Sequence, residues 1–429
     1  MDLRELLAKA QSAGAVTEID REVDPRLELA QIAAELDGRI VIFNRVRGSQ
    51  YRVVTGLCSD RRYFGLALGV PPDRLCHTMA AALAEPGALP QVSSLHPQSV
   101  VDPSVDLTSI PFLTHYSGDG GPYATAAVLF VDDPTTGPNA SFHRLMRLDR
   151  CRVAARLVEG RGLATIWRET GEDVPVAICI GLPLHILLAA SMSPPPGVNE
   201  LGIAQALAPM PLARCSNGIG VPADAEFILE GRLTHTLVDE GPFVDLTGTY
   251  DFVRRQPVIE IDQVTHRGDA LYQALLPGRL EHRLLMGMPR EPTILSEVNR
   301  VAHCCNVHVT AGGASWLHAV VQIEKAGPQD GFRAIEAAFR GHSSLKHVVA
   351  VDADVNIFDM SMVEWAIATR FQADRDLRIY RDQPSSSLDP SATHRPGEKS
   401  RTAKMGLDAT IHWDSKDGPA DPSKHRRVV

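Results

Sequence analysis

The chain of 429 residues is 44% hydrophobic and 22% charged, which is typical of a folded globular protein and argues against a disordered one. Its length exceeds one ordinary hydrophobic core, so we expect two or three domains. The formal net charge of −9 is not accompanied by a basic stripe, which argues against nucleic acid or an anionic membrane surface as the main partner.

The cysteines and the apolar runs indicate where in the cell the protein is located. Seven scattered cysteines fit a reducing cytoplasm better than a disulfide framework. Residues 1–5 contain no apolar core and no cleavage signal, so no export is expected. The longest apolar run, residues 176–192, is interrupted by Pro183 and His185 and is too short to span a bilayer. We therefore predict a cytoplasmic protein.

The N-terminal part mixes helical and strand patterns. A short amphipathic helix is predicted by apolar residues at helical spacing, namely Leu3, Leu6, Leu7 and Ala10. Residues 39–46 alternate as a strand, and residues 75–84 resume a helical pattern. This mixture predicts a small α/β domain over residues 1–105.

The middle of the chain is rich in strand patterns. Residues 123–131 form a continuous β-type run, and residues 139–148 form a second strand beyond a turn-rich loop, which suggests an antiparallel pair. Other predicted elements are strands at 174–180, 225–230 and 258–264 and helices at 184–190 and 201–207. We expect residues 106–295 to form a domain built around a β-rich barrel.

The C-terminal part changes to strand–helix alternation. Strands are predicted at 307–310, 319–323 and 347–351, with a helix at 331–339. This order predicts a C-terminal α/β domain over residues 296–429. Residues after about 384 are expected to be loop-like.

An acidic turn is the strongest candidate for chemistry. Glu240 and Asp245 flank a Gly-Pro pair that can continue neither a helix nor a central strand, so the bend can aim both acids at one point. The alternative is a solvated loop. The segment 138–144, far upstream, supplies the amide of Asn139 and the cation of Arg144, which could pair with an acid.

Two histidine-containing segments remain open to more than one interpretation. The run His303-Cys304-Cys305-Asn306-Val307-His308 suggests a zinc cluster, but adjacent cysteines on a strand point to opposite faces and a C-x₂-C spacing is absent. We interpret it as a strand with buried thiols. His282 either lines a substrate pocket or is a structural histidine.

The motifs, taken in order along most of the chain, resemble the UbiD family of decarboxylases, which use prenylated FMN. They are Asp119-Gly120-Gly121-Pro122, Asn139 with Arg144, Glu200, Val221-Pro222-Ala223, Glu240-Gly241-Pro242-Phe243 with Asp245, Thr265-His266-Arg267, Thr310-Ala311-Gly312-Gly313, Asp352-Ala353-Asp354, Thr369-Arg370 and Lys404-Met405-Gly406-Leu407-Asp408. The resemblance implies a mixed α/β multidomain fold with a central split β-barrel that binds the flavin and a C-terminal domain that mediates oligomerisation.

The resemblance also implies a metal and cofactor site. Asn139 and Glu200 match the family's Mn²⁺ ligands, and K⁺ is a further candidate cation. The residues that match cofactor-binding positions are Phe142, His143, Arg144, Arg156, Arg161, Gly162 and Lys346. A histidine that the family commonly has near the metal is absent from the segment 159–162, where Glu159 or water could substitute.

Arg144, Glu240 and Asp245 match the family's catalytic residues. Arg144 and Glu240 receive the ionised, positioning role, and Asp245 is the expected proton donor. The implied reaction is the reversible, non-oxidative decarboxylation of an α,β-unsaturated or aromatic acid: the acid forms an adduct with the cofactor, CO₂ leaves, and Asp245 protonates the adducted carbon. Val244 stands where the family usually has glycine, and a branched side chain there can reshape the pocket.

Alternatives remain within this interpretation. One is an enzyme that works in the carboxylase direction or on an aromatic acid without cycloaddition. Another is a non-catalytic subunit of a multi-component enzyme, which would be expected to lose one of the three catalytic residues, and all three are present. The expected partners are a small acid substrate, a flavin prenyltransferase that supplies the cofactor, and further copies of the chain in a homodimer or larger homo-oligomer.

Overall fold

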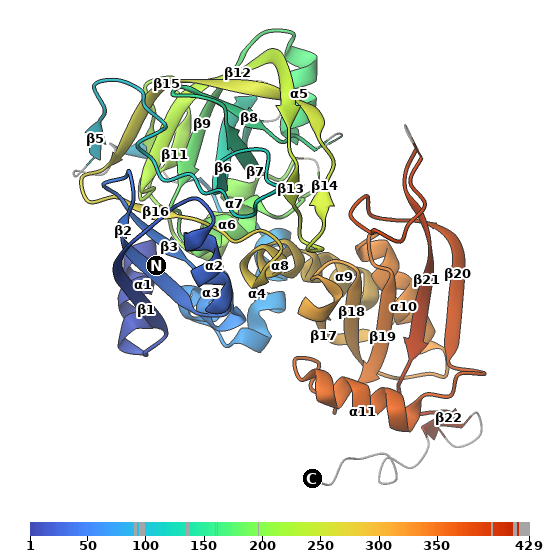
Figure 1. Cartoon of the computed structure of the whole chain (residues 1–429). Coiled ribbons are helices and arrows are strands. Elements are labelled where there is room, and N and C mark those ends of the chain that lie inside the picture. The colour runs from blue at the N-terminus through green and yellow to red at the C-terminus, as the bar shows by residue number, and fades with distance from the viewer. Residues whose placement is uncertain are drawn as a thin grey trace. The chain divides into compact units, whose positions relative to one another are not determined.

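The computed structural model describes residues 1–89, 92–93, 99–133, 137–158, 160, 162–195, 197–395, 398–414 and 418–419. The chain divides into two compact units (Figure 1). The first unit comprises Met1–Pro72 and Ala82–Leu285, and the second comprises Asp73–Ala81 and Met286–Val429.

A four-stranded sheet opens the first unit, in the order β1 (Val16–Val23), β2 (Ile40–Val46), β3 (Arg52–Thr55) and β16 (Leu271–Gln273). Its helices are α1 (Leu3–Ser12), α2 (Glu28–Glu35) and α3 (Arg61–Leu68). The predicted helix α1 begins at a capping box, because the Asp2 carboxylate accepts the N–H of Glu5 and the Glu5 side chain accepts the N–H of Asp2. The edge strand β16 comes from far along the chain and pairs in parallel with β3.

Six antiparallel strands form a closed barrel in the first unit. They are β6 (Tyr123–Asp133), β7 (Gly137–Arg147), β8 (Arg152–Ala155), β9 (Val174–Ile180), β12 (Phe227–Glu240) and β15 (Arg254–Arg267). The order β12-β9-β6-β7-β8-β15 closes because β12 also pairs with β15, and β5 (Ser99–Val101) extends β15. Buried side chains such as Leu129, Ile178 and Ile259 fill the core. The predicted barrel and the predicted antiparallel pair β6–β7 are confirmed.

Shorter elements complete the first unit. The helices are α5 (Gly162–Thr170), α6 (Leu184–Ala190), α7 (Glu200–Leu207) and α8 (Leu280–Gly287), the last ending just inside the second unit. A small sheet has the order β11 (Gly220–Pro222), β10 (Leu212–Arg214) and β4 (Val92–Ser93), and β13 (Phe243–Val244) pairs with β14 (Tyr250–Asp251). The long apolar run divides into β9 and the fully buried α6. None of the helices in the described residues is long and apolar enough to cross a membrane.

The second unit contains a five-stranded sheet, in the order β17 (His303–Val309), β18 (His318–Glu324), β19 (His347–Asp352), β21 (Arg401–Asp408) and β20 (Leu377–Pro384). Its helices are α9 (Glu291–Asn299), α10 (Asp330–Gly341), α11 (Met360–Arg370) and most of α4 (Leu75–Ala84). Short 3₁₀ turns are η1 (Pro72–Arg74), η2 (Met288–Arg290) and η3 (Ala311–Gly313), and β22 (Trp413–Asp414) pairs with β23 (Gly418–Pro419).

One expectation for this unit is wrong. Residues after 384 are not all loop-like, because β21 lies between β19 and β20 and pairs with both. Its apolar residues are sparse, and its burial is intermittent along the strand. The two neighbouring strands supply hydrogen-bond partners that the local pattern does not reveal.

Candidate active site

The acidic turn is held against a glycine-rich loop. Strand β12 ends at Glu240, and the Gly241–Pro242 peptide bond that follows is cis. The backbone N–H of Gly120 donates to the carbonyl oxygen of Pro242 at 2.8 Å. A Cβ on Gly120 would lie 2.1 Å from the Gly241 carbonyl oxygen, so only glycine permits this approach. The two motifs, far apart in sequence, therefore form one structural feature.

Arg144 and Glu240 form a buried bidentate ion pair. The guanidinium donates from Nε to Oε1 at 2.8 Å and from Nη2 to Oε2 at 2.9 Å, and Tyr123 donates its hydroxyl to Oε1 at 3.1 Å. The Glu240 side chain is 0% exposed and that of Arg144 is 9% exposed. The planar guanidinium matches the two carboxylate oxygens, so this pair fixes the direction in which Arg144 points.

Asp245 is more accessible to solvent than Glu240, the other acid of the turn. Its Oδ2 lies 3.3 Å from Nη1 of Arg144, and its Oδ1 accepts the backbone N–H of Leu246 at 2.7 Å. Its side chain is 17% exposed. The structure thus brings together the three residues that the sequence singled out, from β7, from the end of β12 and from the loop after β13.

His282 lies next to this acid. Its Nε2 is 4.0 Å from Oδ1 of Asp245, and its Nδ1 accepts the N–H of Gly278 at 3.2 Å, which leaves the proton of a neutral ring on Nε2. Burial lowers the pKa of His282, although the charge of Asp245 opposes this effect. His282 therefore lies beside the acid network, and its place in a substrate pocket stays a prediction.

A third acid was missed by the sequence reasoning. The Oδ2 of Asp251 lies 3.2 Å from Nη2 of Arg144 and 2.6 Å from Nη1 of Arg254. Burial opposes its ionisation, but the hydrogen bond from Arg254 and the charge of Arg144 together lower the pKa of Asp251. The available signal was the Thr247-Gly248 turn, since pairing across a hairpin there brings Asp251 opposite Phe243.

Three arginines, Arg144, Arg254 and Arg156, lie within 4.0 Å of Oδ2 of Asp251. The Nε of Arg156 lies 4.0 Å from Oδ2 of Asp251, and the backbone N–H of Arg156 donates to the Arg144 carbonyl oxygen at 3.2 Å. Burial and the neighbouring cations Arg254 and Arg144 lower the pKa of Arg156. An anionic group would relieve this repulsion, so the surroundings of Arg156 suit a phosphate.

Asn139 and Glu200 meet at the start of α7. The Asn139 amide nitrogen lies 3.2 Å from Oε2 of Glu200, which also accepts the N–H of Ala140 at 3.2 Å. Burial raises the pKa of Glu200, although these neutral donors oppose it. The donor set consists of a carboxylate and an amide oxygen, which are ligands that hard divalent cations prefer, so a bound Mn²⁺ fits these residues.

The neighbouring cofactor candidates cluster around the same strand. Ser141 lies 2.9 Å from Nε2 of His143, whose Nδ1 is 2.8 Å from the carbonyl oxygen of Arg156. Burial lowers the pKa of His143 to about 4, so this ring is neutral near pH 7. A Cβ on Gly162 would lie 3.2 Å from the Asn139 amide nitrogen, which leaves little room for a larger residue. Phe142 pairs with Val128 across β6 and β7.

Three predicted positions stay predictions. Arg161 and Glu159 lie outside the described residues. Lys346 belongs to the second unit, where its ammonium lies 3.0 Å from Oδ2 of Asp389 and also contacts Ser391. Its approach to the cofactor therefore stays a prediction.

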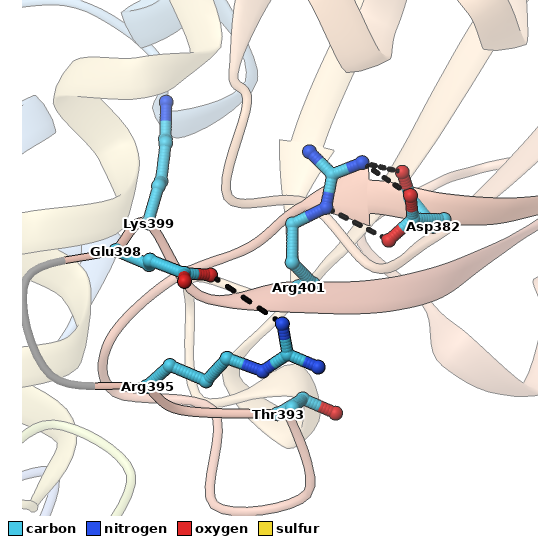
Figure 2. A pocket seen from close by; sticks show the side chains of 6 residues that line it. All are labelled: Asp382, Thr393, Arg395, Glu398, Lys399 and Arg401. Carbon is cyan, nitrogen blue, oxygen red and sulfur yellow. Dashed lines mark hydrogen bonds and ion pairs between the residues drawn. The ribbon is translucent and has the colours of Figure 1, made fainter.

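A separate open pocket of about 510 Å³ lies in the second unit. Figure 2 shows Arg401 directed at Asp382 and Arg395 directed at Glu398, while Lys399 points away from both pairs. Thr393 completes the labelled lining. The charges in these two pairs are already matched, and the pocket contains none of the predicted catalytic residues.

Comparison with known proteins agrees with the motif order. Three domains of 3-octaprenyl-4-hydroxybenzoate carboxy-lyase (UbiD) match the chain: the N-terminal domain at residues 7–83, the Rift-related domain at 91–280 and the C-terminal domain at 283–409. A relative from Methanosarcina mazei, anhydromevalonate phosphate decarboxylase, is 42% identical over 416 residues, which are 96% of each chain.

Solved structures give the same result. The UbiD-class enzyme HmfF from Pelotomaculum thermopropionicum in complex with FMN has a TM-score of 0.92 and 36% identity, covering 100% of this chain and 97% of that one. An evolved dimeric form of HmfF in complex with prFMN has a TM-score of 0.87 and 35% identity, covering 100% of this chain and 99% of that one.

Proposed function

The chain belongs to the UbiD family of carboxy-lyases, and on this premise we propose that it is a prenylated-FMN-dependent decarboxylase of a phosphorylated α,β-unsaturated acid such as anhydromevalonate phosphate. The observation that carries the proposal is the contact of Arg144 with both Glu240 and Asp245.

The substrate class comes from the relatives. The Methanosarcina protein is similar over almost its whole length, and its name specifies a phosphate ester of a dehydrated hydroxy acid. Loss of water next to a carboxylate leaves a carbon–carbon double bond conjugated with it, as the proposed chemistry requires. We therefore favour this aliphatic acid over the aromatic acids that the sequence left open.

The two acids receive different roles from their surroundings. Bound prenylated FMN supplies an electron sink for the charge left when CO₂ departs. Glu240, fully buried and held at both oxygens, keeps Arg144 in position. Asp245 has a single contact with Arg144 and is partly exposed, so it is the acid that can reach a substrate carbon and deliver the proton.

The cofactor would lie among groups that suit its parts. Arg156, with the cations Arg144 and Arg254 nearby, suits the phosphate, and Asn139 with Glu200 suits the Mn²⁺ that would neutralise it. Glycine at position 162 avoids a close contact with the Asn139 amide. Phe142, His143 and Arg144 come from the same strand, β7, and are proposed to line the isoalloxazine.

The proposal extends to the cellular setting. We propose that a flavin prenyltransferase supplies the cofactor and that the chain forms a homodimer or a larger homo-oligomer. All seven cysteines are free thiols, five of them core residues with 0–5% exposure, which supports a location in the reducing cytoplasm.

The test replaces the proposed proton donor. The protein would be produced together with a flavin prenyltransferase, and CO₂ release from anhydromevalonate phosphate would be followed for wild type and Asp245→Asn. We expect the variant to keep the absorption spectrum of the bound cofactor and to lose at least about 100-fold in turnover, in line with the loss of a general acid.

The controls separate substrate from mechanism. Asp239→Asn removes an exposed carboxylate of β12 that forms an ion pair with Arg255, and should leave turnover unchanged. Near wild-type turnover by Asp245→Asn would overturn the assignment of the donor. Turnover of aromatic acids but not of anhydromevalonate phosphate would overturn the proposed substrate class.

A further inference from the structure

A histidine, a cysteine and a glutamate lie close together where β17 and β18 pair in the second unit. His303 begins β17, and Glu324 ends the antiparallel neighbour β18 directly opposite it. The Nδ1 of His303 lies 2.8 Å from Oε2 of Glu324. One ligand atom from each of His303, Cys305 and Glu324 lies within 4.8 Å of the other two.

The backbone explains why Cys305 faces this group. Cys304 pairs with Ile323, but Asn306 already pairs with Gln322, so Cys305 is the extra residue of a β-bulge. Cys304 is buried in the core with Val307, whereas Cys305 is partly exposed on the side of His303. Adjacent cysteines do point to opposite faces, as the sequence indicates, but one of them thereby joins a histidine and a glutamate from the next strand.

We propose that His303, Cys305 and Glu324 bind a Zn²⁺ ion. Imidazole nitrogen, thiolate sulfur and carboxylate oxygen are all zinc ligands. Mg²⁺ and Ca²⁺ prefer oxygen ligands, so a site with a thiolate does not suit them. A neutral imidazole, a thiolate and a carboxylate balance the two positive charges of the ion. The fourth tetrahedral position is left for water.

A contact from another segment of the same unit fixes the backbone at Cys305. His77, from the α4 segment of the same unit, places its Nε2 2.8 Å from the Cys305 carbonyl oxygen and holds the bulge in place. The ion would join β17 to β18 at the end of their ladder, so it would stabilise the second unit.

The test uses the full chain, stripped of metal by a chelator and titrated with Co²⁺, which reports thiolate ligation through a charge-transfer band. The proposed flavin site, Asn139 with Glu200, contains no sulfur and would not produce this band. We expect one thiolate-bound Co²⁺ per chain, displaced by Zn²⁺. Cys305→Ser and His303→Ala should each weaken Zn²⁺ binding by at least about 10-fold, in line with the loss of a ligand.

Cys151→Ser is the matched control, because Cys151 is the exposed cysteine of the first unit. This variant should leave the Co²⁺ charge-transfer band unchanged. Absence of the band in wild type, or its survival in Cys305→Ser with a native circular dichroism spectrum, would overturn the proposal. Neither result bears on decarboxylation, which is measured separately with the Asp245 variant.

Discussion

Arg144 is a buried cation that touches three carboxylates, and its neighbours determine what each acid can do. Burial by itself would lower its pKa, but the hydrogen bonds and charges of Glu240, Asp245 and Asp251 outweigh that effect and raise it. Its guanidinium also lies over the Phe243 ring, 4.6 Å from the centroid. The residue that orients the proposed donor is therefore constrained on all sides.

Asp251 gives the first residue-scale prediction. Asp251→Asn removes the charge that lies between Arg144 and Arg254, and we expect a loss of about 1–3 kcal/mol in the free energy of unfolding. Turnover should fall because Arg144 loses one of the three carboxylates that hold its guanidinium beside Asp245. Urea denaturation and steady-state kinetics check both effects, with Asp239→Asn as the exposed control. Unchanged stability and turnover would mean that Asp251 does not position Arg144.

Glu281 gives a prediction about pH. Burial raises its pKa from 4.5 to about 7, against hydrogen bonds from backbone N–H groups such as that of Cys58. The folded state therefore holds this proton at pH values where the unfolded chain has lost it, and stability falls as pH rises from about 4.5 to about 7. The full effect is about 3 kcal/mol.

The measurement compares urea midpoints of wild type and Glu281→Gln between pH 5 and pH 7.5. The variant cannot ionise, so its stability should vary less with pH over this range. Glu35→Gln, at an exposed position of α2, should keep the wild-type slope. If the urea midpoints of wild type and Glu281→Gln changed with pH in the same way, the pH dependence of stability would come from another group.

At the scale of elements, the site depends on two loops that fit together only through glycine. Gly120→Ala would place a Cβ 2.1 Å from the Gly241 carbonyl oxygen, and no flexible side chain can yield there. We expect a loss of about 1–3 kcal/mol in stability and a marked fall in turnover, since Glu240 moves with its neighbour. Gly220→Ala, which meets nothing within 4 Å, should change stability by less than about 0.5 kcal/mol. If urea denaturation showed the same loss of stability in Gly120→Ala and Gly220→Ala, the close approach of Gly120 to Gly241 would not be the cause.

At the scale of the whole molecule, each unit is completed by a segment from elsewhere in the chain. Strand β16 pairs with β3, and its Tyr272 is fully buried. Cys76 of α4 lies in the core of the second unit, and Asn306 donates to the carbonyl oxygen of Asp73 at 2.7 Å. The three-part division predicted from the sequence can be tested with fragments.

We expect neither residues 1–105 nor residues 296–429 to fold alone. The first fragment lacks β16, and the second lacks α4 and the first half of α9, so each leaves apolar core exposed. Circular dichroism and urea denaturation of the two fragments check this expectation, with the full chain as the control. A cooperative unfolding transition in either fragment would contradict it.

The sequence by itself determined the family, the barrel and the three residues Arg144, Glu240 and Asp245. Apolar alternation identifies strands such as β6 and β7. Short local motifs contain the acidic turn and Arg144, which pairs with it. These features depend on neighbours in the chain, so a pattern can reveal them.

Only the tertiary structure decided the rest. Asp251 joins the network because it contacts Arg144 of the distant strand β7, and β21 and β16 become strands because distant strands offer hydrogen-bond partners. The physical reason is common to all of them: pairing between segments far apart in sequence is set by closure of the barrel and by the order of the sheets, and no local pattern encodes that order.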